Sequence, residues 1–219
     1  MPLHTSDALI LRTYTLGESD RIVVFLTRDR GKKRGVAKNA RQSRRRFGGA
    51  LEPMTLGRVG YLEREQRDLV SLHYVEPMRS PLSAVDGEAL GYAGYFAEMI
   101  DEWAQEADPN ETLFRLGASM VEAIAAGIPI EPLARYFEYW LLRLQGVYEP
   151  DPRLSADARA FLSAARRLSP FGLGQVAVSR GTLRELEAAH RALIAMHLEK
   201  DLKSVRVLRD MRAGGHGGS

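Results

Sequence analysis

The spacing of apolar residues changes at about residue 81, and this change divides the chain into two regions of different secondary structure. Before it, five short runs favour strands, at 7–14, 21–27, 32–38, 54–62 and 68–76. After it, apolar residues recur every three or four positions. A period of two is typical of strands and a period near 3.6 is typical of helices. We therefore expect an α+β protein with an N-terminal β domain and an all-helical C-terminal domain.

The five expected strands lie within about 75 residues and fit an OB-fold barrel, a small curling barrel of five strands. Gly57 and Gly60 fall inside the fourth run, where they predict bulges or tight bends. Residues 32–38 are expected to form a strand edge and residues 41–47 a loop. Strand faces and loops of such barrels commonly hold oligonucleotides.

Five helices are expected after residue 81. The first ends near Ala107, and the others span about 108–126, 132–144, 155–168 and 182 onward. Asp108 is expected to cap the second helix, and Thr182 with Glu185 predicts a capping box for the last. We place the domain boundary at 80/81, so that the barrel is 1–80 and the helical domain 81–212. The glycine-rich end, 213–219, is expected to be a flexible tail.

Positive charge is concentrated between Arg28 and Arg46, which hold ten of the 31 basic residues and one acid, Asp29. The other 200 residues carry a net charge of −6, so the overall +3 hides one strongly positive region. Such a concentration favours a polyanionic partner, most simply nucleic-acid phosphates. The alternative is a solvated loop or a targeting signal, because short basic runs often have no other role.

Phe47 follows three arginines and precedes Gly48 and Gly49, so we expect it in a loop. Arginine beside an aromatic ring is what a single strand needs, since the charge contacts phosphate and the ring stacks on a base. The alternative is that Phe47 plugs the end of the barrel. Both interpretations stay open at the level of sequence.

No pattern indicates catalysis, a cofactor or a metal site. The chain has no cysteine, which excludes disulfides, thiolate zinc sites and a cysteine nucleophile. It contains no nucleophile elbow, zinc-protease helix or phosphate-binding loop, and FGLG at 171–174 is expected to be a turn. No run approaches the length of a membrane helix, and no signal peptide begins the chain. We expect a soluble intracellular protein.

Two groups of polar helical residues could be mistaken for sites. Glu98, Asp101 and Glu102 share one helix and suggest a metal pair, but no histidine accompanies them, so a solvated face is expected. His190 and His197 continue an apolar stripe and are separated by two turns, whereas two ligands of one metal normally lie one turn apart. They are expected to be partly buried structural residues.

Four segments of the chain resemble the RecO family of bacterial DNA repair and recombination mediators. They are LILRTYTLGESD at 9–20, VVFLTRDRGKKRGVAKNAR at 23–41, SRRRFGGALEPM at 43–54 and HLEKDLKSVRVL at 197–208. The resemblance covers nearly the whole chain, and its N-terminal run is the most specific part. It implies an OB-fold domain followed by a helical domain.

This resemblance implies a non-enzymatic mediator of the RecF pathway in the bacterial cytoplasm, on the nucleoid. Such proteins bind single- and double-stranded DNA, anneal complementary strands, and work with RecR to load RecA onto DNA coated by single-strand-binding protein. They also contact the acidic C-terminal tail of that protein through the helical domain. No membrane or small-molecule substrate is implied. With the family as guide, the DNA-contact candidates are Arg28, Lys32, Lys33, Arg34, Lys38, Arg41, Arg44, Arg45, Arg46 and Phe47.

One departure from the family concerns a zinc module. Many members carry four cysteines in the region that matches 148–178, and this chain has none. The region is therefore a degenerate counterpart, in which Phe161, Leu162 and the following loop would need apolar packing in place of metal. Two other functions stay open: an adaptor whose basic loop docks an acidic protein, and an RNA-binding barrel.

Overall fold

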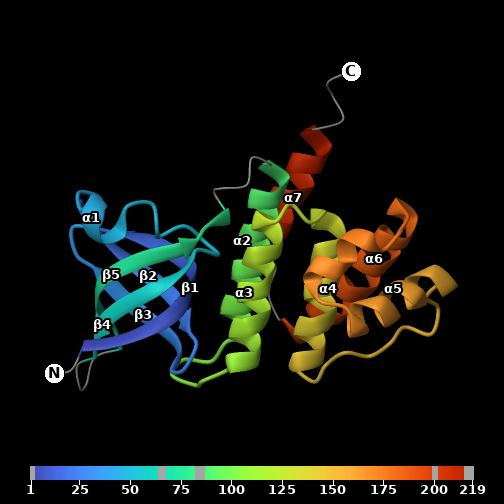
Figure 1. Cartoon of the computed structure of the whole chain (residues 1–219), viewed down its shortest axis with the longest axis horizontal. Helices are drawn as coiled ribbons and strands as arrows, with labels where there is room; N and C mark the ends of the chain where they lie inside the picture. Colours follow the sequence, from blue (N-terminus) through green and yellow to red (C-terminus); the bar gives the residue numbers. More distant parts are fainter. Residues whose placement is uncertain (1–2, 64–67, 82–86, 199–201, 215–219) are drawn as a thin grey trace.

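The computed structural model describes residues 3–63, 68–81, 87–198 and 202–214. A barrel of strands forms one end of the molecule, and helices pack beside it in successive layers (Figure 1). None of the helices in these ranges is long and apolar enough to span a membrane.

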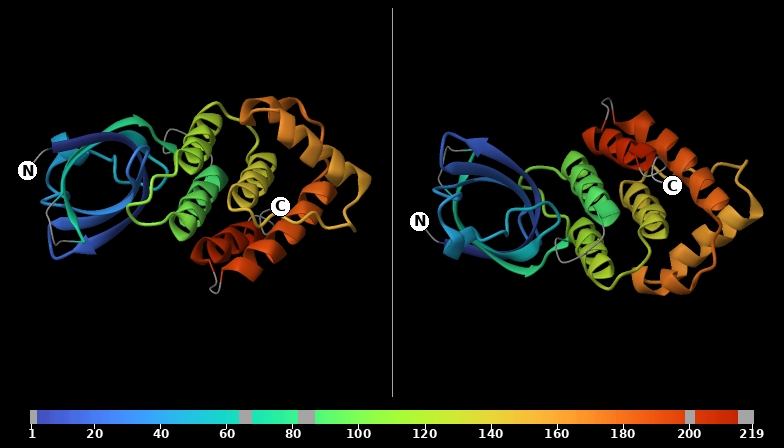
Figure 2. Two further views of the ribbon diagram at one scale, coloured as in Figure 1. Left: turned by 90° about the horizontal axis from the view of Figure 1, so that it is seen from below. Right: turned by 90° about the horizontal axis from the view of Figure 1, so that it is seen from above.

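The barrel consists of β1 (Leu3–Leu16), β2 (Asp20–Thr27), β3 (Gly31–Ala37), β4 (Leu56–Leu62) and β5 (Val70–Arg79). The strands close in the order β1-β2-β3-β5-β4, and only the short pairing of β3 with β5 is parallel. Seen along its axis, the sheet makes a ring (Figure 2). The expected OB-like strand region followed by helices is confirmed.

Strand β4 carries the two irregularities expected from its glycines. Its register with β5 shifts between Leu56 and Gly57 and again between Gly60 and Tyr61. A Cβ atom on Gly57 would lie 2.6 Å from the carbonyl oxygen of Glu76. Glycine is needed there because the two backbones approach too closely for any side chain.

A single helical turn, α1 (Arg44–Phe47), lies between β3 and β4, where only a loop was expected. It closes one end of the barrel, whose interior is filled by alternate residues of the strands together with α1 and the turn that follows it. The buried side chains are Ala8, Ile10, Val23, Phe25, Ala37, Phe47, Ala50, Val59, Tyr61, Val70, Leu72 and Val75.

The helical region comprises α2 (Gly87–Trp103), α3 (Glu111–Ala125), α4 (Ile130–Leu144), α5 (Ala156–Arg167), the 3-10 helix η2 (Pro170–Gln175), α6 (Arg180–His197) and α7 (Lys203–Gly214).

Two expected caps were wrong by two or three residues. Asn110, rather than Asp108, accepts the capping hydrogen bond of α3, and Ser179 caps α6. Helix α7 was not expected as a separate helix. It covers 203–214, including the start of the predicted flexible tail, while 215–219 lie outside the described residues.

A second hydrophobic core, separate from the barrel interior, lies between the outer face of the barrel and the helices. Leu9, Leu11, Val24 and Leu26 project outward from β1 and β2 and join the buried residues of α2 and α3 in a single cluster. Burying such side chains stabilises the contact by roughly 1.5–3 kcal/mol each, so this face of the barrel is unavailable to a ligand.

Residues 148–178 pack through apolar side chains, as the absence of cysteine requires. Phe161, Leu162 and Leu173 are buried, and the indole N–H of Trp140 donates to the carbonyl oxygen of Ala165 at 3.0 Å. Helix α5 and η2 are thereby attached to α4 without a metal ligand.

Candidate nucleic-acid interface

The first half of the basic stretch is neutralised within the molecule. We call Arg28–Arg34 the paired segment, because each of its five cations lies near a carboxylate. The ion pairs are Arg28–Glu111 at 2.8 Å, Arg30–Asp29 at 3.8 Å, Lys32–Asp101 at 3.2 Å, Lys33–Glu63 at 2.6 Å and Arg34–Glu106 at 3.9 Å. Three of these acids come from the helical region and one from the end of β4.

The edge of β3 at Lys32 is covered, which contradicts the expected open strand edge there. The Lys32 amide donates to the Gln105 carbonyl at 3.3 Å, and the Ala107 amide donates to the Lys32 carbonyl at 3.0 Å. Gly31, with φ of +69°, permits this approach, because a Cβ atom there would lie 2.3 Å from the carbonyl oxygen of Asp108. The segment after α2 thus extends the sheet beside Lys32.

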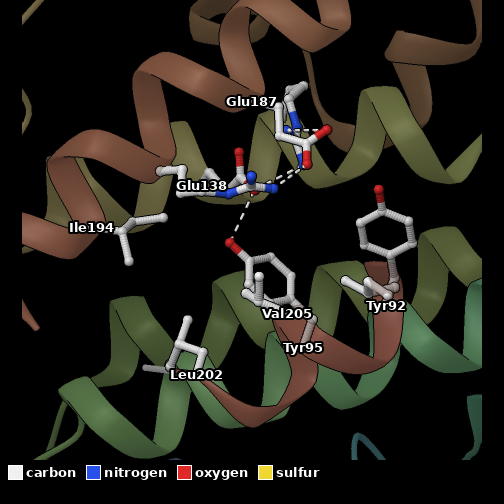
Figure 3. A pocket seen from close by; sticks show the side chains of 10 residues that line it. Tyr92, Tyr95, Glu138, Glu187, Ile194, Leu202 and Val205 are labelled. Carbon is white, nitrogen blue, oxygen red and sulfur yellow. Dashed lines mark hydrogen bonds and ion pairs between the residues drawn. The ribbon is translucent and has the colours of Figure 1, made fainter. Parts of the chain in front are cut away.

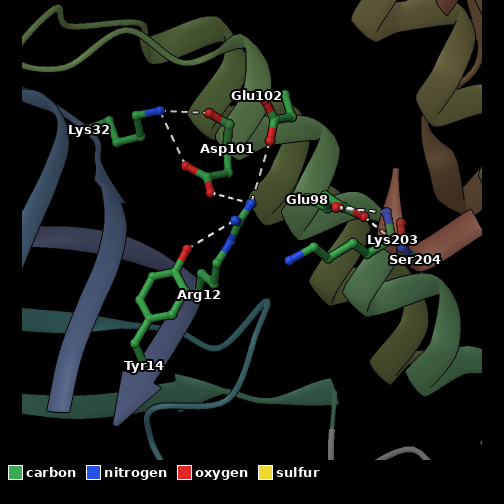
Figure 4. A network of polar contacts seen from close by, with 8 residues as sticks. All are labelled: Arg12, Tyr14, Lys32, Glu98, Asp101, Glu102, Lys203 and Ser204. Carbon is green, nitrogen blue, oxygen red and sulfur yellow. Dashed lines mark hydrogen bonds and ion pairs between the residues drawn. The ribbon is translucent and has the colours of Figure 1, made fainter. Parts of the chain in front are cut away.

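Asp101 and Glu102 contact the barrel and do not form the solvated face expected for them (Figure 4). Asp101 lies 2.7 Å from Arg12 Nη2 and 3.2 Å from Lys32 Nζ, and its side chain is 12% exposed. Glu102 lies 3.6 Å from the same Arg12 atom. Although partial burial opposes the charge of Arg12, Asp101 holds the pKa of this guanidinium above its ordinary value. These pairs join the two domains.

Glu98, the third acid of this group, caps a helix. Its carboxylate accepts hydrogen bonds from the Lys203 amide at 3.0 Å and the Ser204 amide at 2.7 Å, at the start of α7. Burial opposes ionisation, but these hydrogen bonds prevail and hold the pKa of Glu98 below its ordinary value of 4.5. Within the described ranges, no three acidic or histidine side chains converge as a metal site.

Lys33 points into the barrel rather than toward solvent. Its Nζ atom lies 2.6 Å from Glu63 Oε1, and only 16% of its side chain is exposed. The hydrogen bond from Lys33 lowers the pKa of Glu63, while burial, together with the charge of Glu63, raises the pKa of the neighbouring Tyr61 to about 12. Lys32 and Lys33 therefore act as structural cations in the fold, and their role as DNA contacts stays a prediction.

The second half of the stretch keeps its charge. We call Lys38–Arg46 the unpaired segment, because no described carboxylate lies within 4.0 Å of its described cations. Arg41 donates to the Glu18 carbonyl at 3.1 Å, and Arg46 donates to the Lys38 carbonyl at 2.7 Å. Neutral oxygens orient these guanidinium groups without cancelling their charge. Lys38, Arg41 and Arg45 are exposed, and the side chain of Arg44 lies outside the described residues.

Phe47 is 2% exposed and belongs to the barrel core, which decides between its two interpretations. It plugs the barrel end, and its predicted stacking on a base is wrong because the ring is not accessible. The Arg46 guanidinium lies 5.1 Å from the ring centroid and covers it from outside. The signal in the sequence was the spacing of Phe47, Ala50 and Leu51, which is that of a buried helical turn.

Two barrel residues at this end were not predicted from the sequence. Arg21 is half-buried at the start of β2, with Nη1 3.4 Å from Thr15 Oγ1 and no described carboxylate within 4.0 Å. It pairs with Ala37 in the sheet, directly before Lys38. Tyr14 is 43% exposed on β1, and its hydroxyl accepts a hydrogen bond from Arg12 at 2.9 Å. Placing Arg21 beside the unpaired segment requires the strand register.

A second polar cluster lies inside the helical domain (Figure 3). Glu138 accepts a hydrogen bond from the Tyr95 hydroxyl at 3.0 Å, forms an ion pair with Arg135 at 2.9 Å, and contacts His190 Nδ1 at 3.0 Å. These groups are buried and connect α2, α4 and α6. The expectation of a structural, buried residue is confirmed for His190, which is 1% exposed, but is wrong for His197, which is exposed.

Comparison with known proteins identifies the same two regions. Residues 1–81 match the family model described as "Recombination protein O N terminal", and residues 84–160 match "Recombination protein O C terminal". The chain is 43% identical over 150 residues to the DNA repair protein RecO of Koribacter versatilis, covering 68% of this chain but 61% of that relative. It is 30% identical to the RecO protein of Geobacter metallireducens over 94% of this chain and 97% of the relative. The chain therefore belongs to the RecO family of DNA repair proteins.

Proposed function

We propose that this chain is a non-enzymatic mediator of DNA repair and recombination, which binds DNA through the unpaired segment of its barrel. The observation that carries the proposal is the set of exposed cations at Lys38, Arg41 and Arg45, for which no described residue supplies a counter-charge. Their natural partner is a polyanion, because releasing counterions from nucleic-acid phosphates favours the contact. Membership in a family of DNA repair proteins supports DNA as that polyanion.

Contacts of this kind do not read sequence. Lysine and arginine side chains on a loop reach phosphates, whereas base recognition needs side chains placed in a groove of the duplex. We therefore propose binding to both single- and double-stranded DNA, with little sequence preference and strong dependence on salt. If about five phosphates of a single strand are neutralised, log K falls with log salt at a slope near −3.5.

The further steps of the proposed role rest on family membership. They are annealing of complementary strands, cooperation with RecR, contact with the tail of single-strand-binding protein, and assistance to RecA on coated DNA in the bacterial cytoplasm and nucleoid. The acidic helical domain, with a net charge of −4 over residues 81–219, suits protein contacts better than DNA contacts. This division of charge supports separate surfaces for DNA and for protein partners.

The experiment is annealing of two complementary labelled strands, measured with and without single-strand-binding protein, beside anisotropy titrations of one strand at several salt concentrations. We expect annealing in both conditions and steep salt dependence of binding. Absence of micromolar DNA binding at moderate salt would instead favour the adaptor function. Tighter binding to a matched RNA strand would favour an RNA-binding barrel, because the 2′-hydroxyl is the distinguishing group.

A further inference from the structure

A groove opens at the end of the barrel beside the unpaired segment, between the start of β2 and the turn around α1. Its volume is about 410 Å³, within the range of roughly 300–1,000 Å³ that is typical of small-ligand sites. We call it the mouth groove and define it by Thr13, Arg21, Arg41, Leu51, Glu52 and Pro53. We propose that it holds one unstacked nucleotide of a single strand, whose phosphate lies between Arg21 and Arg41. The proposal rests on the DNA-binding function above and identifies single-stranded DNA as the form that occupies the groove.

The charge of the groove suits a single phosphate. Arg21 and Arg41 donate only to neutral oxygens, Thr15 Oγ1 at 3.4 Å and the Glu18 carbonyl at 3.1 Å, so both keep their full positive charge. Arg12 also lines the groove, but its guanidinium is neutralised by Asp101 at 2.7 Å. Glu52 adds one negative charge to the wall. The net charge of +1 from these groups matches one phosphodiester.

The remaining surface of the groove suits a base. Leu51 and Pro53 are half-buried and offer apolar area, and the planar arginine side chains can stack on a flat ring. Thr13 is held in the floor by a hydrogen bond to the Leu51 carbonyl at 2.7 Å. A Cβ atom on the exposed Gly49 would meet nothing within 4 Å, so the rim leaves space for a strand to pass.

Occupancy of the groove requires a base that is free to leave its neighbours. In a duplex, each base is paired and stacked, and extracting it costs a few kcal/mol. In a single strand, this cost is smaller. The mouth groove therefore adds affinity for single strands only, whereas Lys38 and Arg45, outside it, contact the phosphates of either form.

Two double variants of equal charge separate these contributions. We expect Arg21→Gln with Arg41→Gln to lower the ratio of single-strand to duplex affinity by about 10-fold, a loss within the range for one stacked base. The matched control, Lys38→Gln with Arg45→Gln, should weaken both forms equally and leave the ratio unchanged. Equal weakening of both forms by the Arg21/Arg41 variant would overturn the groove while leaving DNA binding intact. If the wild-type protein binds no DNA, the proposed function itself fails.

A second measurement uses the unaltered protein. Amide chemical shifts are recorded by NMR as the dinucleotide d(TpT) is added. We expect the largest changes at Arg21, Arg41 and the adjoining Gly48 and Gly49 amides. Changes confined to Lys38 and Arg45 would overturn the proposal, because the dinucleotide would then bind only to the outer cations.

Discussion

The two halves of the basic stretch contain the same number of basic residues but differ in what those residues contact. Each carries five basic residues, but the paired segment has a carboxylate near every cation, whereas the described cations of the unpaired segment contact only neutral oxygens. The paired segment ends within β3 and contacts the end of α2, the connection to α3 and the start of α3. The unpaired segment includes α1, on the side of the barrel away from the helices (Figure 1). Positive residues that are adjacent in sequence therefore divide into structural and available charges.

The largest expected effect is on stability and comes from Asp101, the carboxylate that pairs with both Arg12 and Lys32. Asp101→Asn keeps the shape of the side chain but leaves Lys32 without its carboxylate and Arg12 with Glu102 alone, at 3.6 Å. Because Asp101 is 12% exposed, we expect the free energy of unfolding to fall by about 3 kcal/mol, as for breaking a largely buried pair. Chemical denaturation measures this change. As a control, Asp151→Asn breaks a solvent-screened pair with Arg153 and should leave the free energy of unfolding nearly unchanged.

The next effect tests the available charges. Replacing Lys38, Arg41 and Arg45 by glutamine removes three exposed cations that have no described counter-charge. We expect the slope of log K against log salt for a single strand to become less steep by about 2.1, at roughly 0.7 per phosphate contact. Anisotropy titrations measure the slope. Unchanged thermal unfolding shows that the variant is folded, and an unchanged slope would remove this segment from the interface.

A gain of binding is expected from releasing structural charges. Glu106→Gln and Glu111→Gln remove the partners of Arg34 and Arg28, which are 45% and 55% exposed. The two freed guanidinium groups should then steepen the salt slope, by at most about 1.4. The same titrations measure it. A slope identical to that of the wild-type protein would mean that position, rather than pairing, keeps these arginines away from DNA.

The smallest expected effect is the pH dependence of α7 docking. The pKa of Glu98 is below 4.5 in the folded protein, so its contribution is present above that pH and is lost as pH falls through the lowered pKa. Glu98→Gln should cost about 1 kcal/mol at pH 7, as for loss of a helix cap, and should remove the loss of stability that begins as pH falls below about 4.5. Denaturant melts at several pH values measure this. Glu149→Gln, at an exposed position, is the matched control and should leave the profile unchanged.

Local signals predicted most of the fold. The change of period near residue 81 separated strands from helices, and Gly57 and Gly60 located the bulges of β4. The predictions that were wrong concerned residues whose contacts come from distant parts of the chain. Asp101 looks solvated on its own helix, because its partners Arg12 and Lys32 come from distant strands. Helix α7 was not predicted because the end of α6, at His197, was not recognised in the sequence.

The candidate site was predicted as a region rather than as a set of side chains. The excess of positive charge between Arg28 and Arg46 is visible in the sequence. The division of these residues into a paired and an unpaired segment is not. Lys33 points inward because it lies opposite Phe25 in the pairing of β2 with β3, and Arg21 reaches the barrel mouth because it lies opposite Ala37. Both placements follow from register, which composition and spacing do not determine.

Two pairs of exposed cations, one from each segment, can be compared directly. The measurement is the salt dependence of single-strand binding for Lys38→Gln with Arg45→Gln against Arg28→Gln with Arg34→Gln. Both variants remove two exposed positive charges and change the net charge equally. We expect the first to make the slope less steep by about 1.4 and the second to leave it unchanged. Equal flattening by both variants would contradict the division of the basic stretch into structural and available charges.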